Sequence, residues 1–187
     1  DTGYHIAHTE SVQKGRSGVA VLTRTEPKDV RPHCGDPYFD DSGRWIEVDV
    51  PLSDGSLLTA VSTYIHAGGV GTPAQDDKYR LLERMVQRMI AINAHADYGV
   101  LTGDLNIAHS QRDIRNWKGN VGKAGFLPAE QAYLDRVASE AGTGLNYYFI
   151  GADSLQGVIR GYHHVTGVPP MMPKWAYGFW QSRQRYE

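Results

Sequence analysis

The chain is poor in cysteine, in excess charge of one sign and in long apolar runs. Cys34 is its single cysteine, so no disulfide can form within the chain, which fits a reducing compartment. The formal net charge of −2 excludes an overall basic field for nucleic acid, although a local basic patch remains possible. No stretch approaches the roughly 18 consecutive apolar residues of a transmembrane helix, and the N-terminus lacks the apolar core of a signal peptide. These absences predict a soluble, cytoplasmic protein with no membrane partner.

What is present is the composition of one globular domain. The chain has 187 residues, 41% hydrophobic and 21% charged, which is enough for a core of its own. It begins with Asp rather than Met, so we expect it to be a piece of a longer protein. A loop rich in Pro, Asp and Gly is expected at 26–42. Apolar runs and alternating patterns predict strands, the second and third joined in a hairpin, at 18–23, 45–50, 57–65 and 98–102.

A helix is expected to begin at Pro73, and a shorter one runs from Pro128 to about residue 140. Thr72 fits the N-cap of the first helix, and Gln75 completes a capping box. One face at helical spacing carries the apolar residues Leu82, Met85, Val86, Met89 and Ile90. A more polar side, interpreted as a solvated face, carries Arg80, Arg84 and Arg88.

The strand at 98–102 ends in small and polar residues, and this end is where the chemistry is expected. Asp104 and Asn106 are two residues apart, so on an extended backbone both side chains point the same way. An anionic acceptor beside an amide suits an attacking water and a phosphoryl oxygen, with a hard cation nearby. The alternative is an Asx-turn in which Asp104 only bonds its own backbone. The loop at 107–126 carries cations, amides and an aromatic residue, which suits a phosphate backbone.

Several of these stretches resemble, in order, the exodeoxyribonuclease III family of apurinic/apyrimidinic endonucleases, within the endonuclease/exonuclease/phosphatase superfamily. The resemblance runs over about residues 4–139, and the shared strings lie at 15–24, 43–47, 102–109, 113–120 and 124–130. It implies an α/β fold that is part of a four-layer sandwich. It also implies a DNA-repair phosphodiesterase that depends on Mg²⁺ (or Mn²⁺), cuts beside abasic sites and trims 3′ ends. The implied partner is double-stranded DNA, abasic or with 3′ ends, and the implied state is a monomer.

The resemblance assigns roles to individual residues. Asp104 matches a residue that orients or deprotonates the attacking water and ligates the metal. Asn106 matches its phosphate-holding partner, and Tyr64 matches a tyrosine against the scissile phosphate, unless Tyr64 is simply a core aromatic. For His109 we expect only a local hydrogen bond within its loop. The loops that grip the DNA backbone carry Arg16, Asn116, Lys118 and Asn120.

Departures from the family pattern predict an impaired enzyme. His66 and Ala67 stand where the family has Pro and then Asn or Ser. The family's metal-binding glutamate, an early asparagine, a later aspartate and a closing Asp–His dyad have no counterpart here. Asp36, Glu47 and Asp49 are candidates to replace the glutamate, and we expect that none does. Glu47 and Asp49 lie in mid-strand and are expected to face solvent.

From about residue 144 the sequence resembles family 31 glycoside hydrolases, which cleave α-glucosides and α-xylosides. The strings that carry this resemblance lie at 148–150, 158–162 and 173–183. We therefore expect a nuclease-like part at 1–140 and a strand–helix–strand tail at 141–187. The tail is expected to pack poorly or to borrow an edge of the nuclease sheet. Two alternative functions stay open: a fragment of an α-glucosidase or α-xylosidase, and a non-catalytic chimeric remnant.

Overall fold

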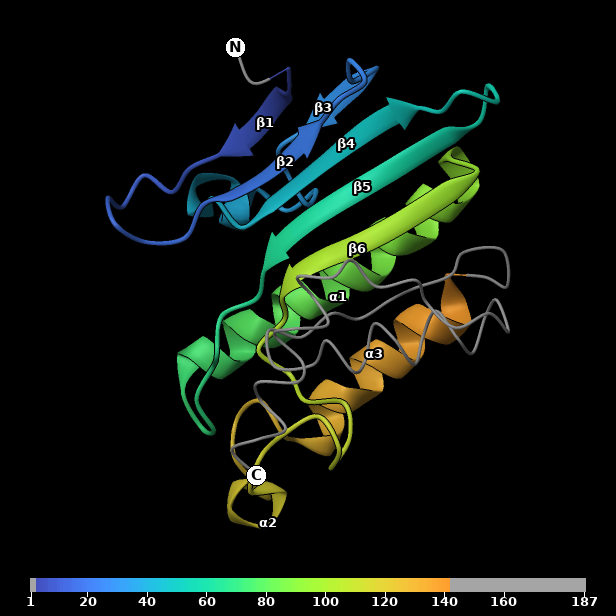
Figure 1. Ribbon diagram of the computed structural model, residues 1–187. Coiled ribbons are helices and arrows are strands. Elements are labelled where there is room, and N and C mark those ends of the chain that lie inside the picture. Colours follow the sequence, from blue (N-terminus) through green and yellow to red (C-terminus); the bar gives the residue numbers. More distant parts are fainter. Residues whose placement is uncertain (1–2, 142–187) are drawn as a thin grey trace, which may run out of the picture.

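A computed structural model describes residues 3–141 as a mixed α/β fold (Figure 1). The predictions for the tail fall on residues 142–187, outside the described residues. The elements, in chain order, are β1 (His5–Thr9), β2 (Val19–Thr23), β3 (Asp29–Arg31), the 3₁₀-helix η1 (Pro37–Ser42), β4 (Trp45–Pro51), β5 (Leu57–Tyr64), α1 (Pro73–His95), β6 (Tyr98–Asp104), α2 (Trp117–Asn120) and α3 (Pro128–Glu140).

The main sheet has the strand order β3–β4–β5–β6. β4 and β5 form the expected antiparallel hairpin, and β5 pairs with β6 in parallel. A parallel pair needs a long crossover, and α1 supplies it by running back along the sheet (Figure 1). Parallel pairing brings the C-terminal ends of β5 and β6 to one edge, where Tyr64 lies opposite Asp104.

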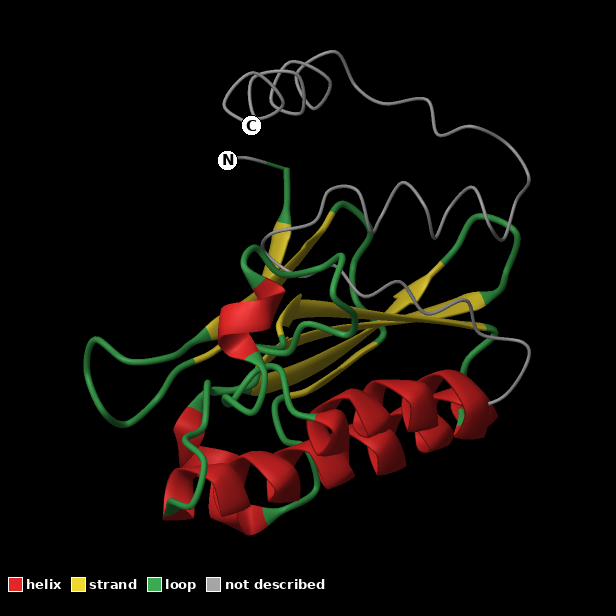
Figure 2. Cartoon of the chain, turned by 90° about the horizontal axis from the view of Figure 1, so that it is seen from below, coloured by secondary structure: helices red, strands yellow, loops and turns green. Residues whose placement is uncertain are grey.

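The main sheet lies between two other layers (Figure 2). One face packs against α1 and α3 through a core that includes Val61, Leu101 and Leu134. The other face packs against the β1–β2 hairpin, where Ala7 meets Ile46, Val48 and Val50. The described residues therefore form an α–β–β arrangement, which is part of the expected sandwich.

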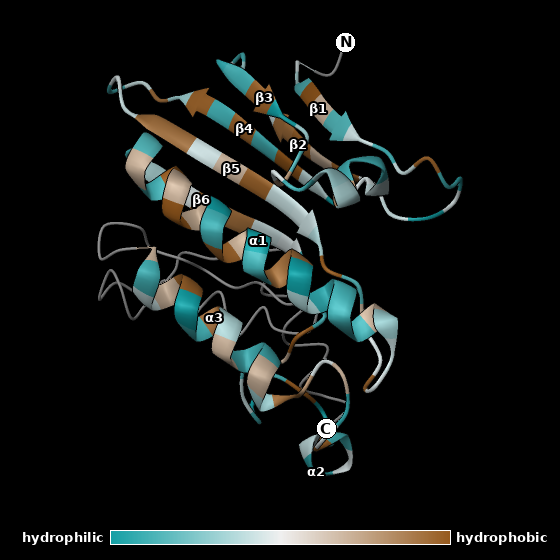
Figure 3. Cartoon of the chain, turned by 180° about the vertical axis from the view of Figure 1, so that it is seen from behind, coloured by the Kyte–Doolittle hydropathy of each residue, from teal (hydrophilic) through white to brown (hydrophobic). Residues whose placement is uncertain are grey.

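Helix α1 begins at Pro73 as predicted, and it is amphipathic. Teal and brown residues alternate along it in Figure 3. Its apolar face is fully buried at Leu82, Met85, Val86 and Met89. Each such side chain stabilises the fold by about 1.5–3 kcal/mol relative to an exposed one.

The capping box predicted for α1 is wrong. The Thr72 side chain makes no cap hydrogen bond, and its Oγ1 donates instead to the Gly69 carbonyl at 2.7 Å. The Gln75 side chain makes no capping hydrogen bond, because the buried carboxylate of Glu130 accepts its Nε2 at 2.9 Å and its Oε1 accepts the Gly69 N–H at 3.1 Å. For Gln75, a hydrogen bond to the distant Glu130 thus replaces the local capping hydrogen bond.

Strand β4 is buried on both faces, which corrects two further expectations. Glu47 and Asp49 are only 0% and 2% exposed, so neither faces solvent. Arg88 is not simply solvated, because its Nε donates to Glu47 Oε1 at 2.7 Å. Arg80 likewise donates to the buried Asp36, at 2.6 and 2.7 Å. The arginine side of α1 is therefore an ion-paired side that neutralises buried carboxylates.

Candidate active site

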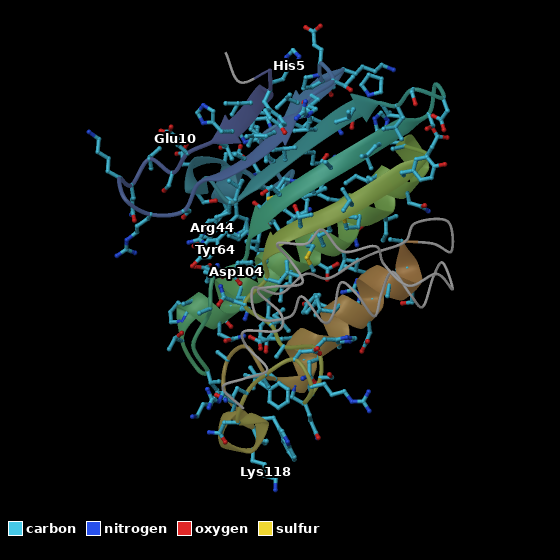
Figure 4. All side chains as sticks on the ribbon, in the orientation of Figure 1. His5, Glu10, Arg44, Tyr64, Asp104 and Lys118 are labelled. Carbon is cyan, nitrogen blue, oxygen red and sulfur yellow. The ribbon has the colours of Figure 1, made fainter. Side chains whose placement is uncertain are left out.

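The candidate site lies at the edge where β5 and β6 end side by side. Tyr64 and Asp104 are the last residues of these strands and are register partners. Figure 4 shows their side chains close together, with Arg44 beside them. The guanidinium carbon of Arg44 lies 4.9 Å from the Tyr64 ring centroid, and its Nη1 donates to the Tyr64 carbonyl at 3.3 Å. A cation, a phenol and a carboxylate therefore meet at one edge of the sheet.

Arg44 was not predicted as a site residue, although the register of the β4–β5 hairpin places it beside Tyr64. It directly precedes β4, and Trp45 pairs with Thr63, so the start of β4 lies beside the end of β5. Burial lowers the pKa of Arg44, the Tyr64 phenol opposes this, and the positive charge of Arg16 lowers it further. The guanidinium stays charged, because arginine is effectively always protonated in proteins. Arg16 and Arg44 thus place positive charge at this edge.

Asp104 and Asn106 are joined by an Asx-turn. The Asn106 backbone N–H donates to Asp104 Oδ1 at 2.9 Å, and its Nδ2 donates to Oδ2 at 3.2 Å. Asn106 has a positive φ of 48°, so the backbone has left the extended conformation. The two side chains meet through this turn. The expectation that they point the same way from an extended strand is therefore wrong. The Asx-turn alternative describes the local geometry correctly, and any chemistry of Asp104 has to operate within it.

The polar groups of Asn106 are almost all engaged. Nδ2 also donates to the Ile65 carbonyl at 2.8 Å, so both amide hydrogens are in use. The Asn106 carbonyl accepts from Lys78 Nζ at 2.9 Å. Within residues 3–141, no donor reaches Oδ1. As it lies, Asn106 can accept a hydrogen bond from water, but it has no free hydrogen for a phosphoryl oxygen.

The close approach of β5 and β6 at this edge depends on Gly103. Its φ is 122°, a backbone conformation that side-chain-bearing residues rarely adopt. A Cβ built at this position would overlap the Thr63 carbonyl oxygen. Any other residue would therefore have to push apart the two strand ends that carry Tyr64 and Asp104.

A buried ion pair lies directly behind the edge. The side chains of Lys78 and Glu130 are both fully buried, with 2.8 Å between Nζ and Oε1. Lys78 also donates to the Ala67 and Asn106 carbonyls, at 3.1 and 2.9 Å. Burial lowers the pKa of Lys78, and the Glu130 carboxylate opposes this shift. The sequence offered one signal for this residue: Lys78 is four residues before the buried Leu82, on the apolar face of α1.

The second carboxylate oxygen of Glu130 holds the end of the loop at 107–126. Oε2 accepts the Gly125 N–H at 2.7 Å and the Leu127 N–H at 3.2 Å. The base of the loop is closed by a hydrogen bond of 2.8 Å from the Ala108 N–H to the Gly125 carbonyl. His109 lies 2.7 Å from Asp135 in α3, so the expectation of a bond within its own loop is wrong.

The expected DNA-gripping residues fall into two separate places. Arg16 lies in the β1–β2 loop, near Arg44. Lys118 is exposed on α2, a helix that the sequence did not predict, and Figure 4 shows it far from Tyr64 and Asp104. Asn120 Nδ2 donates to the Asn116 carbonyl at 3.1 Å, so these two residues shape the same turn. The structure thus groups the α2 residues together but does not bring them to the strand edge.

The departure at His66 has a structural explanation. His66 Nε2 lies 2.9 Å from the Ala74 carbonyl, in the first turn of α1. Because a carbonyl only accepts, Nε2 carries the hydrogen, and the ring holds the segment after β5 against the helix. Burial lowers the pKa of His66, which favours this neutral form. His66, at a position where the sequence departs from the family pattern, therefore has a structural contact with α1.

Oxygen ligands for a hard cation are few among the described residues. Asp36, Glu47 and Asp49 each pair with arginine rather than lying at the strand edge. Residues 3–141 contain no group of three or more His, Cys, Asp or Glu side chains placed to hold a metal. At the strand edge, the Asp104 carboxylate and Asn106 Oδ1 are the oxygen groups available in this part of the chain. Mg²⁺ commonly takes one or two carboxylates and fills its shell with water and phosphate, so Asp104 fits as a single ligand.

Comparisons with known proteins agree with this architecture. The model of the Endonuclease/Exonuclease/phosphatase family matches residues 2–183, and the chain belongs to this family. It is 35% identical over 119 residues to the DNA repair nuclease APEX1 of Danio rerio, covering 64% of this chain and 36% of that protein. It is 31% identical over 147 residues to exodeoxyribonuclease III of Haemophilus influenzae, covering 72% and 52%. The chain therefore spans about half or less of the length of these relatives.

Two solved structures share the fold. An AP endonuclease from Archaeoglobus fulgidus has a TM-score of 0.61 at 23% identity, covering 73% of this chain and 50% of that chain. A 3′–5′ exonuclease from Neisseria meningitidis has a TM-score of 0.64 at 21% identity, covering 74% and 52%. The partial α/β sandwich expected from the sequence is thereby confirmed.

The second resemblance is also found, over a short stretch. The chain is 52% identical over 52 residues to an alpha-xylosidase of Saccharolobus solfataricus, covering 28% of this chain and 7% of that protein. The division at residue 140 stays a prediction. In the described part of the chain, no helix combines the length and apolar character needed to cross a membrane.

Proposed function

We propose that this chain acts on the DNA backbone as a divalent-cation-dependent phosphodiesterase of the AP endonuclease and 3′–5′ exonuclease type. The observation that carries the proposal is the meeting of Tyr64, Asp104 and Arg44 at one strand edge, in a chain of this nuclease family. A structural neighbour, a 3′ phosphatase from Neisseria, is bound to product DNA hairpin, which supports DNA as the substrate class. DNA repair is the corresponding biological role.

In this proposal each group at the edge has its own task. Asp104 accepts the proton of the attacking water, and Asn106 Oδ1 accepts a second hydrogen bond that orients it. The Tyr64 hydroxyl donates to the non-bridging phosphoryl oxygen on which charge develops. Arg44 and Arg16 attract the phosphate, while Asn116, Lys118 and Asn120 contact the backbone further along the duplex.

Mg²⁺ or Mn²⁺, with Asp104 as one ligand, would offset negative charge on the leaving oxygen. The described residues place a single carboxylate among the three groups that meet at the edge. We therefore expect slower turnover than in the longer relatives. A monomeric state, a cytoplasmic location, and action at abasic sites or 3′ ends remain predictions from the sequence.

The decisive experiment is Asp104→Asn in a nicking assay on a labelled duplex with an abasic analogue, with and without Mg²⁺. Asparagine keeps an oxygen that can accept the Asn106 N–H, so the Asx-turn survives while the charge is removed. We expect a loss of about 10²- to 10⁴-fold in rate, the usual contribution of a general base.

Asp97→Asn is the matched control, because Asp97 lies at the other end of β6 and only accepts the Leu57 N–H, at 2.8 Å. It should leave the rate unchanged. Equal rates for the Asp104→Asn variant and the unmodified chain would reduce Asp104 to a turn-forming residue and remove the proposed mechanism.

A further inference from the structure

The Lys78–Glu130 pair contacts the backbone of three segments at the candidate site. Lys78 Nζ donates to Ala67 after β5 and to Asn106 after β6, at 3.1 and 2.9 Å. Glu130 Oε2 accepts from Gly125 and Leu127 at the end of the loop at 107–126. A two-residue pair thus joins both catalytic strand ends to the loop that carries α2.

The geometry of the pair indicates precise placement more than stabilisation. All three ammonium hydrogens have an acceptor, because Nζ also contacts Glu130 Oε1 at 2.8 Å. A buried ion pair usually stabilises no better than well-packed apolar residues would, because desolvation offsets the attraction. The Lys78–Glu130 pair instead makes directional hydrogen bonds. They fix the positions of backbone carbonyl and N–H groups, which apolar side chains cannot hold.

Asn106 is the group that most needs such support. It adopts a positive φ of 48°, which is uncommon for a residue other than glycine. Its N–H and Nδ2 are held by Asp104 and Ile65, and its carbonyl is held by Lys78. Gln75 steadies the same pair from α1, since its Nε2 donates to Glu130 and its Oε1 accepts the Gly69 N–H at 3.1 Å.

We propose that Lys78 and Glu130 are positioning residues, which hold the Asp104–Asn106 turn and the 125–127 turn in one fixed arrangement. Asp104, Asn106 and the loop at 107–126 then keep one relative position, although neither Lys78 nor Glu130 touches substrate. This inference rests on the proposed function for its meaning in catalysis, but its structural part can be tested without activity.

The test compares three variants of the full chain: Lys78→Met, the double variant Lys78→Met/Glu130→Leu, and Arg88→Met. Arg88 is the matched control, because it pairs with the buried Glu47 on the same helix and contacts none of the site loops. The measurements are urea unfolding, amide hydrogen exchange of residues 104–108 and 125–127, and kcat and KM on the abasic duplex.

We expect Lys78→Met to speed exchange at 104–108 and 125–127 by about tenfold beyond any global change. It should lower kcat by about 10- to 100-fold with little change in KM, as misplaced reacting groups do. The double variant should regain stability, because no charge is left buried alone, but it should regain neither protection nor kcat. Arg88→Met should lose stability without these local changes.

Two outcomes overturn the inference. The first is Lys78→Met exchange at 104–108 and 125–127 that matches Arg88→Met at equal stability. The second is recovery of protection and kcat in the double variant. If the unmodified chain fails to nick DNA, the proposed function fails, and the exchange measurement alone still decides whether the pair positions these turns.

Discussion

Helix α1 contributes residues to several charge clusters with buried carboxylates, and two of them, one at each half of the helix, differ in what they contact. The loop cluster, in the N-terminal half, consists of Gln75, Lys78 and Glu130. The sheet cluster, in the C-terminal half, consists of Arg31, Glu47, Asp49, Arg88 and His95. Lys78 and Glu130 reach backbone groups of the site, whereas the sheet cluster joins side chains to one another. Burial of charge therefore does not by itself mark a functional site. What distinguishes the loop cluster is that Lys78 and Glu130 contact backbone groups of the candidate site.

Within the sheet cluster, the carboxylates are closely matched by donors. Arg31 binds Asp49 through two nitrogens, at 2.8 and 2.7 Å, and also donates to Glu47 at 2.9 Å. Thr59 and His95 complete the shell of Asp49, at 2.6 and 2.7 Å. Such a closed network leaves no site for a ligand, and its role is to fasten α1 and β3 to β4.

The largest effect is expected for Glu47→Ala. This change leaves Arg88 and Arg31 without their shared partner and should lower the free energy of unfolding by about 3–5 kcal/mol. Urea denaturation measures the loss. Hydrogen exchange at 125–127, corrected for the global change, should stay as in the unmodified chain. Local loosening of that turn would show that the two clusters are coupled and would end the contrast between them.

The second-largest effect is expected from acid, which should lower the stability that the sheet cluster contributes. Burial raises the pKa of Asp49, but hydrogen bonds from Arg31, Thr59 and His95 outweigh it and leave the pKa below its usual value. Burial likewise opposes the hydrogen bonds that lower the pKa of Glu47. The unfolded chain then binds more protons than the folded one, so stability is full above the ordinary carboxyl pKa of about 4 and falls below it.

Each proton taken up on unfolding should contribute about 1.4 kcal/mol per pH unit in this range. Unfolding followed at a series of pH values checks the slope, with Asp49→Asn as the comparison. That variant should show a shallower acid dependence. An unchanged slope would assign the acid sensitivity to other carboxylates.

The smallest effect is expected for Arg136→Ala. Arg136 also connects α3 to α1, through Glu83 at 2.6 Å, but both side chains are more than a third exposed, at 35% and 42%. Exposed pairs of this kind contribute about 0–1 kcal/mol. The loss should stay below about 1 kcal/mol in urea unfolding and should vanish in high salt. If Arg136→Ala lowers the free energy of unfolding as much as Lys78→Met does, burial does not explain the difference between the Arg136–Glu83 and Lys78–Glu130 ion pairs.

The sequence was sufficient for elements whose pattern is local. The hairpin of β4 and β5, the start of α1 at Pro73 and the strand that begins at Tyr98 follow from alternation, helix signals and a buried run, although this strand runs two residues beyond the predicted 98–102. The parallel pairing that brings Tyr64 beside Asp104 was not predicted from these patterns; only the family resemblance assigned both residues to one site. The family resemblance supplied the roles of these residues, which periodicity cannot do.

What the sequence could not supply depends on partners far along the chain. Glu47 looked solvent-facing because alternation marks one strand face as polar, whereas Arg31 and Arg88 neutralise it inside the fold. Gln75 looked like a capping residue because its partner Glu130 is 55 residues away. Arg44 and Lys78 gave only weak signals, since their contacts arise from strand pairing and helix packing.

Gly103 is a position at which we expect the fold to accept almost no other residue. A library randomised at this codon and selected for a folded chain should return glycine almost alone, whereas neighbouring surface codons should tolerate many substitutions. Because the overlap would be with the main-chain oxygen of Thr63, no second-site change of side chain can relieve it. Homologous chains that carry another residue here must have separated β5 from β6, and with them the two groups on which hydrolysis is proposed to depend.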